Sequence, residues 1–363
     1  SRRVSDRIWR CIFWKAGLGV VNADLTLQST ARKLLGQIGC TDAFTLEPIA
    51  GGSNNRVTRV DCGEQRFVLK TFFHDEDDPR DRFSTELAFT NFAWHQKLRC
   101  VPQPLSSDLA SRAILFSHAR GKPMTTADVG VDNIEQAMDF LVQLNAHRSK
   151  AGRLPSASEP CFSLADHVQL VDMRIDRLRR FAEDELAREF VESKLTPVWQ
   201  HLRDSPELVG AADYKRLLRP EERCLSPCDL GFHNALCDEN GHITFVDFEY
   251  AGWDDPARTV CDFFCQIAVP IPHQHFDLVI NRLSAMLPAA LKLRDRVTVL
   301  MPIYRIKWCC ILLNEYLPGG RTRREFADAT GDLPPSARST QLGRARAALA
   351  RLTESGILTA GAA

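Results

Sequence analysis

The chain has 363 residues, of which 44% are hydrophobic and 25% are charged. This length and composition are typical of a globular protein with two or three packing units, and they exclude a disordered chain. The 46 basic and 46 acidic side chains cancel. No overall positive charge is therefore available to attract nucleic acid or an anionic membrane, and we expect neither as a partner.

The sequence has no apolar run near the roughly 20 residues that a membrane-spanning helix needs, so we expect no membrane span. Residues 8–21 are interrupted by Arg10 and Lys15 and lack the continuous apolar core of a secretory signal. The twelve cysteines form no CxxC pair, which favours scattered buried thiols over zinc ligands or disulfides. Together these features predict a cytoplasmic protein.

The N-terminal third changes character along its length. Residues 1–40 have a helical pattern and carry no recognisable chemistry. Short strand-like runs follow, and the Gly-rich and polar connections between them are brief enough to make successive strands antiparallel. A helical pattern then precedes one more apolar run. We expect strands at 46–50, 56–61, 66–73 and 113–116, and a helix at 81–98.

After residue 121 the pattern becomes mainly helical. Apolar side chains from Leu164 to Leu178 recur at steps of four, three, four and three residues, which predicts an amphipathic helix. The Ala- and Arg-rich segment 344–352 is also predicted to be helical.

One short segment combines the polar side chains that suit a specific chemistry. Asp229 and Asn234 lie five positions apart, and two short apolar runs joined by an Asn-Gly turn lead from Asn234 to Asp247. An Asn-Gly turn between such runs is a strong signal for a β-hairpin. The hairpin would begin just after Asn234 and end at Asp247, so it would bring these two residues to the same end of the ribbon.

This arrangement suits phosphoryl transfer, in which the protein mainly positions the reactants and offsets charge on the phosphates. Mg²⁺ prefers oxygen ligands, which Asn234 and Asp247 can supply. Asp229 is then placed to accept or orient the proton of an acceptor hydroxyl. We therefore predict Asp229 as the catalytic base and Asn234 and Asp247 as ligands of Mg²⁺.

The same residues carry a resemblance to a known family. Asp229-x4-Asn234 followed by the sequence DFE at 247–249 resembles the catalytic loop and metal motif of eukaryotic-like kinases. The longer sequence VDFEYAGWDDP at 246–256 resembles the aminoglycoside phosphotransferase and choline kinase families. The motifs keep the family's order over roughly residues 45–265.

The resemblance implies an α+β, protein-kinase-like fold with two lobes. A small N-terminal lobe would contain an antiparallel sheet and a helix, and a larger C-terminal lobe would be mainly helical. The expected boundaries are an N-terminal helical extension at 1–40, a nucleotide-binding lobe at 41–119 and a lobe at 120–363 for catalysis and acceptor binding.

The resemblance also implies that ATP and Mg²⁺ are required. In such kinases a lysine on the third strand reaches the phosphates and pairs with a helix glutamate, and Lys70 and Glu86 match these positions. The turn that includes Gly52, Ser53 and Asn54 would cover the triphosphate. This turn has the spacing of neither a Walker A loop nor a GxGxxG loop, and an ordinary hairpin has the same composition.

Two positions depart from the family's pattern. Many relatives have a histidine two residues before the catalytic aspartate, where this chain has Pro227, followed by Cys228. Relatives also have an aspartate three residues after the proline of the DDP sequence, where this chain has Thr259. The support of the catalytic loop must therefore differ from that of these relatives.

A small acceptor is expected, because only about eight residues separate Asp247 from a helix predicted to begin near Pro256. Amino sugars, other sugars and choline-like amino alcohols all remain candidates. Candidate acceptor contacts are Glu249, Asp254, Asp255 and Trp308. The two aspartates are equally well explained as caps of the following helix. Tyr304, Trp308 and Glu315 share a helical face that could hold a quaternary ammonium by cation-π contact, but such a stripe more often packs in the core.

Two other functions remain open. A nucleotide-binding pseudokinase or interaction module would keep the fold without turnover, and the absent loop histidine favours it. A kinase acting on protein or RNA is disfavoured by the neutral charge and the short segment after Asp247. The sequence predicts no particular oligomeric state.

Overall fold

The computed structural model describes residues 26–49, 54–75, 78, 80–211, 213–318, 326–327 and 337–354. Its first element is a helix over residues 26–37. The helical expectation for residues 1–25, and the predicted site residues Gly52 and Ser53, lie outside this part of the chain.

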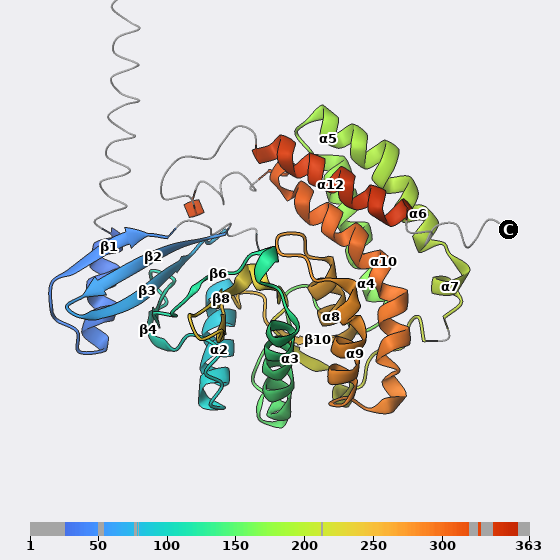
Figure 1. The fold of residues 1–363 in the computed structure, drawn as a ribbon. Helices are drawn as coiled ribbons and strands as arrows, with labels where there is room; N and C mark the ends of the chain where they lie inside the picture. The colour runs from blue at the N-terminus through green and yellow to red at the C-terminus, as the bar shows by residue number, and fades with distance from the viewer. Residues whose placement is uncertain are drawn as a thin grey trace, which may run out of the picture.

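A five-stranded antiparallel sheet forms one end of the molecule (Figure 1). The strands expected from the sequence are present, and the sheet order is β1-β2-β3-β5-β4. Strand β4 was not predicted, because it is an edge strand that begins with proline and is largely polar, without the apolar alternation of a central strand. The strands are β1 (Phe44–Pro48), β2 (Asn55–Cys62), β3 (Gln65–Phe72), β4 (Pro104–Asp108) and β5 (Ala113–Ser117).

The two faces of this sheet are covered by different helices. On one face, Phe67 and Leu69 of β3 pack with apolar residues of helix 26–37. On the other face, Phe72 packs against Phe83 of α2 (Arg82–His95), with ring centroids 5.9 Å apart. Because side chains alternate along a strand, Lys70 lies on the same side as Phe72 and faces α2. The alternation of β3 thus directs its lysine into the molecule.

Helix α2 begins where its sequence predicts. Asp81 is the N-cap, and its side chain accepts a hydrogen bond of 3.2 Å from the Ser84 N–H. The helix ends at His95, before Lys97 adopts a left-handed backbone with φ of 66°. Glu86 and Phe89 are buried on the face that turns toward the rest of the protein.

Helices make up most of the remainder of the chain, as expected (Figure 1). The predicted helix at 164–178 is α4, whose N-cap Ser163 accepts from the Asp166 N–H. The helices are α3 (Val131–Ala146), α4 (Leu164–Phe181), α5 (Glu185–Phe190), α6 (Thr196–Arg203), α7 (Pro206–Val209), α8 (Pro256–Cys265), α9 (Phe276–Ser284), α10 (Leu293–Leu312) and α12 (Ala337–Glu354).

Two small sheets lie among these helices and carry the residues predicted to be catalytic. The predicted hairpin consists of β8 (Ala235–Cys237) and β9 (Ile243–Phe245), and β6 (Lys122–Pro123) pairs with β8. Strands β7 (Cys224–Ser226) and β10 (Gly252–Asp254) form the second sheet. They bracket the catalytic loop and the segment after Asp247.

Apolar packing joins the sheet end to the helical remainder. The Phe89 ring of α2 lies 4.9 Å from the Phe248 ring, which also contacts Phe140 of α3. Gly121, with φ of +117°, crosses so close to Cys237 of β8 that a Cβ atom would lie 2.5 Å from the Cys237 carbonyl oxygen. Only glycine fits this crossing, which lets the following strand β6 pair with β8.

One helical stretch, Ala289–Tyr316, meets the length and composition criteria for a membrane-spanning helix. Half of its most apolar window is buried inside the protein, and α10 within it packs against α4, α8 and α12. Such burial is typical of a core helix, so the stretch is weak evidence for a membrane span.

Candidate active site

Lys70 is the centre of a buried charge cluster between the sheet and the hairpin. Its Nζ lies 2.6 Å from Glu86 Oε2 and 2.6 Å from Asp247 Oδ1. Burial alone would lower the pKa of Lys70, but the charges of Asp247 and Glu86 outweigh burial and raise that pKa above its ordinary value. The ammonium therefore stays charged. We call Lys70, Glu86 and Asp247 the lysine cluster.

Negative charge exceeds positive charge around this lysine. Burial raises the pKa of Glu86, and the nearby carboxylates Asp247 and Glu249 add to the rise that the Lys70 charge opposes. Glu249 is itself buried, and burial together with the Asp247 charge raises its pKa. Glu86 and Asp247 thus share one ammonium, while Glu249 lies 3.9 Å from Arg82 Nε. A further cation at this place would relieve their repulsion.

Asp247 follows the hairpin and connects the lysine cluster to the catalytic loop. Its backbone is left-handed, with φ of 69°, a conformation that costs an aspartate roughly 1 kcal/mol or more. Its side chain is 39% exposed although Lys70 is buried. The Val246 N–H donates to the Asn234 carbonyl oxygen at 2.9 Å, which fixes the two ends of the hairpin side by side.

In the predicted catalytic loop, Asp229 is held by two side chains that follow it in the sequence. Asn234 Nδ2 donates to the Asp229 carbonyl oxygen at 3.0 Å, and His233 Nε2 lies 3.3 Å from Asp229 Oδ1. Burial alone would raise the pKa of Asp229, but the His233 hydrogen bond and nearby positive charges, including that of Lys307, hold it below its usual range. Asp229 is therefore a carboxylate that can accept a proton.

His233 was not predicted as a site residue. Burial lowers the pKa of His233, but the hydrogen bond and charge of Asp229 outweigh burial and raise that pKa above its ordinary value. The sequence did contain a signal, because a histidine four residues after an aspartate is within reach of it wherever the loop is helical, and 232–234 forms a 3-10 turn.

The oxygen donors at this place fit a magnesium ion. Asn234 commits its amide nitrogen to Asp229, and its Oδ1 has no hydrogen-bond partner among the residues described. Asp247 uses one carboxylate oxygen for Lys70 and is open to solvent. A carboxylate and an amide carbonyl are the ligand types that Mg²⁺ takes, with water and phosphate oxygens completing its octahedron.

Asn54 and Asn55, at the end of the predicted phosphate-covering turn, form hydrogen bonds with the segment that follows Asp247. Asn54 Nδ2 donates to Glu249 Oε1 at 2.7 Å and to the Tyr250 hydroxyl at 2.8 Å, and Asn55 Nδ2 donates to Glu249 Oε2 at 2.5 Å. Glu249 is 1% exposed. Here the structure gives Glu249 partners in β2 and its preceding turn.

Asp254 and Asp255, the other acidic candidates, are fully buried. Asp255 is the N-cap of α8 and accepts from the Ala257 N–H at 2.8 Å, with Pro256 at the first helical position, so the capping interpretation applies to it. Its other oxygen lies 2.6 Å from Arg296 Nη2. Asp254 pairs with Arg258 at 2.7 Å.

Trp308 lies in α10 beside a third buried carboxylate. Its Nε1 donates to Asp262 Oδ1 at 2.8 Å, and Lys307 Nζ lies 2.9 Å from both oxygens of Asp262. The Lys307 ammonium also lies 4.6 Å from the centre of the Tyr304 ring, which is itself buried. We call Asp254, Asp255 and Asp262, with their basic partners, the α8 acid cluster.

Comparison with known proteins gives the chain its relatives. No curated protein sequence matches it. Among solved structures it resembles a choline kinase from Cryptosporidium parvum Iowa II, with 14% identity, a TM-score of 0.55, and coverage of 87% of this chain and 91% of the relative. The choline kinase LicA from Streptococcus pneumoniae gives 12% identity, a TM-score of 0.55, and coverage of 90% and 99%.

An aminoglycoside-type relative is also similar. Spectinomycin phosphotransferase APH(9)-Ia, solved with ADP and spectinomycin, gives 11% identity, a TM-score of 0.51, and coverage of 85% of this chain and 93% of the relative. These similarities confirm the expected kinase-like α+β fold. The sequence profile of the phosphotransferase enzyme family matches residues 45–286, about two thirds of the chain, and the chain belongs to that family.

Proposed function

We propose that this phosphotransferase moves the γ-phosphoryl group of Mg²⁺-ATP to a hydroxyl group of a small acceptor. The observation that carries the proposal is the lysine cluster, in which Asp247 joins Lys70 of the sheet to the hairpin that follows Asp229. In this proposal the lobe at 41–119 binds the nucleotide, and the lobe at 120–363 provides catalysis and acceptor binding.

Each residue has a separate role in this proposal. Lys70, held by Glu86, binds the phosphates, and Asn234 and Asp247 hold Mg²⁺, which offsets phosphate charge when bound. Asp229 orients the acceptor hydroxyl and accepts its proton, and its lowered pKa keeps it ionised. Asn54, with Gly52 and Ser53 before it, covers the phosphates.

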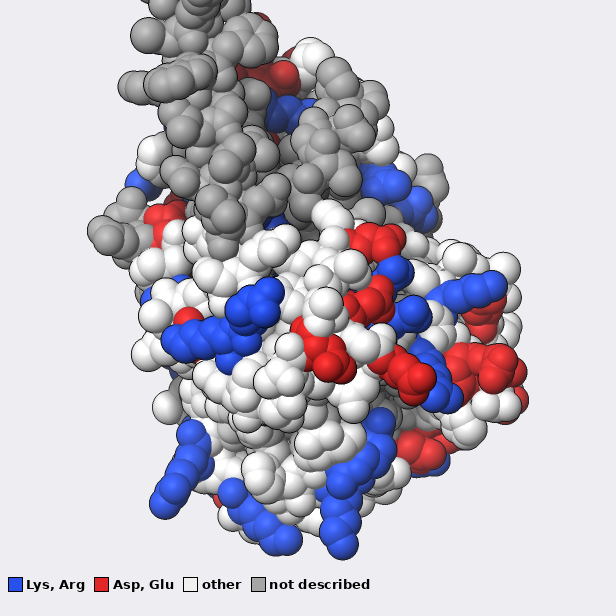
Figure 2. Space-filling model, turned by 90° about the vertical axis from the view of Figure 1, so that its left-hand side faces the viewer, with Lys and Arg blue, Asp and Glu red and all other residues white. Residues whose placement is uncertain are grey.

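Two observations favour a small acceptor over a macromolecule. Helix α8 begins at Pro256, so the segment after Asp247 is too short for the long activation segment of a protein kinase. On the face shown in Figure 2, a broad uncharged area is bordered below by separate basic side chains and on the right by acidic and basic side chains together. The described residues of this face therefore form no continuous basic stripe for RNA.

The α8 acid cluster bears on the choice between a choline-like acceptor and a sugar or amino sugar. An aromatic face beside a carboxylate is the usual place for a quaternary ammonium group. Here the Tyr304 ring and the Asp262 carboxylate both already hold the Lys307 ammonium. The Tyr304 ring of the predicted aromatic stripe is thus engaged within the protein. We therefore favour a sugar or amino sugar over a choline-like acceptor and keep Trp308, which is half-buried, as a candidate contact.

We propose that the protein works in a reducing compartment such as the cytoplasm. Eleven cysteines in the described part of the chain are free thiols, and most are buried. Burial raises the pKa of several of these thiols, for example that of Cys228 to about 12, which leaves them protonated and unreactive.

A screen for turnover tests the proposal. Purified protein is incubated with ATP, Mg²⁺ and pooled sugars, amino sugars and amino alcohols, and release of ADP is measured. We expect acceptor-dependent ADP release that stops when Mg²⁺ is chelated. Nucleotide binding without ADP release in any pool would favour the pseudokinase, and labelled phosphate appearing only in added protein or RNA would favour a macromolecular acceptor.

A further inference from the structure

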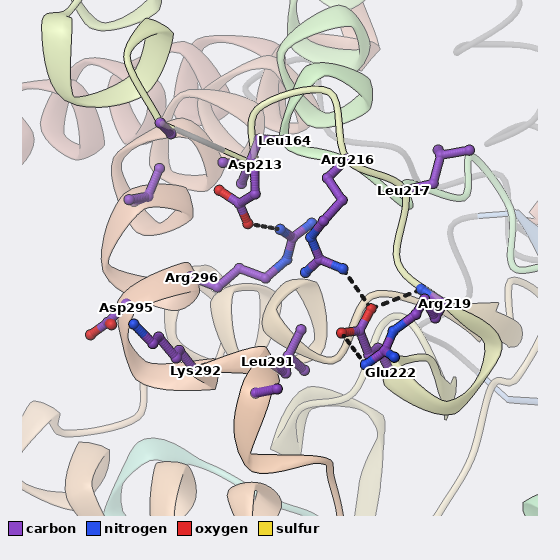
Figure 3. Close-up of a pocket in the computed structure, with 13 residues that line it drawn as sticks. Leu164, Asp213, Arg216, Leu217, Arg219, Glu222, Leu291, Lys292, Asp295 and Arg296 are labelled. Carbon is purple, nitrogen blue, oxygen red and sulfur yellow. Dashed lines mark hydrogen bonds and ion pairs between the residues drawn. The ribbon is translucent and has the colours of Figure 1, made fainter.

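A cavity lies apart from the lysine cluster, and none of Lys70, Asp229 and Asp247 lines it. It has a volume of about 690 Å³ and is formed by the loop before β7 and the N-terminal end of α10, beside the first residue of α4. This volume is within the range of about 300–1,000 Å³ typical of small-molecule sites. Figure 3 shows the lining side chains. We call it the Arg296 cavity.

The cavity has a charged part and an apolar part. Arg216, Arg219, Lys292 and Arg296 supply its positive charge. Leu164, Leu217 and Leu291 are among its apolar side chains. A ligand that fills it would therefore combine a compact anionic group with an organic body.

Arg296 is the strongest sign of a ligand. Its side chain is 3% exposed, and Nε and Nη2 both contact Asp255 Oδ2, at 2.7 and 2.6 Å. Its Nη1 makes no hydrogen bond among the described residues and lies 3.6 Å from Asp213 Oδ2. A buried guanidinium nitrogen without a hydrogen bond is costly, so an acceptor oxygen from a ligand would stabilise it.

The start of α10 adds a second source of positive potential at the same place. Lys292 is the N-cap, and it has no side-chain oxygen to accept from the first-turn N–H groups. Its exposed ammonium forms no ion pair with any described residue. An uncapped helix N-terminus attracts anions, and the twenty residues of α10 supply a full helix dipole.

The acidic residues of the cavity leave room for an anion. Glu222 is fully engaged by Arg216 at 2.8 Å and by Arg219 at 3.2 Å. Asp295 lies in the first turn of α10 and opposes an anion there. Asp213 is 43% exposed, and at 3.6 Å from Arg296 it is too far for a hydrogen bond. A ligand oxygen can therefore displace Asp213 with a gain of hydrogen bonds.

We propose that the Arg296 cavity binds a small organic phosphate monoester. Its phosphate group would lie between Arg296, Arg216 and the Lys292 end of α10, because guanidinium forks and helix N-termini both match phosphate oxygens. In Figure 3 the side chains of Arg216 and Arg296 extend toward the middle of the lining residues. The organic part would lie against Leu164, Leu217 and Leu291.

Titration with phenyl phosphate, followed by calorimetry, tests this site. The wild-type protein should bind it saturably, and more tightly than inorganic phosphate because the apolar wall contributes. Arg216→Gln and Lys292→Gln should each weaken binding about tenfold, by loss of a charge-assisted contact. Asp213→Asn should tighten binding, because it removes the competing carboxylate.

Two controls separate this site from alternatives. Arg294 lies in the same first turn of α10 and is exposed, but it does not line the cavity. Arg294→Gln should leave the affinity unchanged, and equal weakening by it would reduce the effect to general charge and overturn the proposal. Lys70→Met, a change in the lysine cluster, should also leave the affinity for phenyl phosphate unchanged. Loss of binding in Lys70→Met, or no saturable binding to the wild type, would overturn the proposal as well.

Discussion

The lysine cluster and the α8 acid cluster consist of the same residue types, but they differ in solvent exposure and in the balance of charge. In the α8 acid cluster each carboxylate has its own basic partner, as where Lys307 contacts both oxygens of Asp262 at 2.9 Å. In the lysine cluster one ammonium serves two carboxylates, and the Asp247 side chain remains 39% exposed. The first cluster is closed and balanced, and the second is open and short of positive charge.

This difference shows that acidic residues a few positions apart in sequence can serve separate tasks. Asp247 and Asp255 are only eight residues apart. Asp247 is partly exposed to solvent beside Lys70, whereas Asp255 is buried and pairs with Arg296 and His167. Balanced buried charge fixes structure, whereas unbalanced and accessible charge attracts a ligand. Substitutions in the two clusters should therefore fail in different ways.

The largest expected effect is on stability, from Asp255→Ala. This change leaves Arg296 buried without its carboxylate and removes the cap of α8. Breaking a buried charge pair costs about 3–5 kcal/mol, so the free energy of unfolding should fall by about that amount. Urea denaturation measures it. Asp176→Ala, at an exposed pair with Arg179, is the control and should change stability by less than about 1 kcal/mol.

If Asp255→Ala instead left stability intact and abolished acceptor-dependent turnover, the two clusters would not differ as described. Asp255 would then act on the acceptor, and the α8 acid cluster would belong to the active site.

The next largest effect is expected at Asp229, on turnover and not on folding. Asp229→Ala should lower turnover by at least about 100-fold, the lower range for general acid–base catalysis. ATP affinity and thermal stability should stay close to wild type, because Asp229 lies outside the lysine cluster. Steady-state ADP release and nucleotide titration measure the two quantities. Wild-type turnover in this variant would refute the proposed base.

Much of the fold could be predicted because its signals are local. The alternation of β3, the Asn-Gly turn of the hairpin and the steps of α4 each depend on a few neighbouring residues, and all are present in the structure. Strand β4 was missed because its pairing with β5, and not its own residues, makes it a strand. Tertiary contacts override weak local preference at such edges.

The site could be predicted less completely, because partners far apart in sequence decide it. The spacing within one segment indicated Asp229 and Asp247, and the family resemblance indicated Lys70. The sequence could not show that Asn54 binds Glu249, 195 residues away. Nor could it show that the Lys307 ammonium lies over the Tyr304 ring and pairs with Asp262.

A smaller effect is expected at Asp247, on metal-dependent nucleotide binding. Asp247→Ala removes a proposed Mg²⁺ ligand and one partner of Lys70. The gain in ATP affinity on adding Mg²⁺ should shrink by at least about tenfold, since even the outer partners of metal ligands contribute about 10–100-fold. Titration of ATP with and without Mg²⁺ measures this gain. An unchanged gain would remove Asp247 from the metal site, while Asp238→Ala, in the turn of the same hairpin, is expected to leave it unaltered.

The smallest effect concerns the protonation of His233. Its pair with Asp229 is partly accessible to solvent, unlike the closed α8 acid cluster. Asp229 raises the pKa of His233 above 6.5, so the charged ring stabilises the fold fully below pH 6.5, and that contribution is lost as pH rises through the raised pKa. Asp229→Asn removes the negative charge and should shift the His233 titration to lower pH. NMR titration of the histidine rings, with His233→Gln to assign the signal, measures the shift. An unshifted titration would mean that Asp229 and His233 do not interact, and the carboxylate would then lack the partner that helps keep it ionised in the catalytic loop.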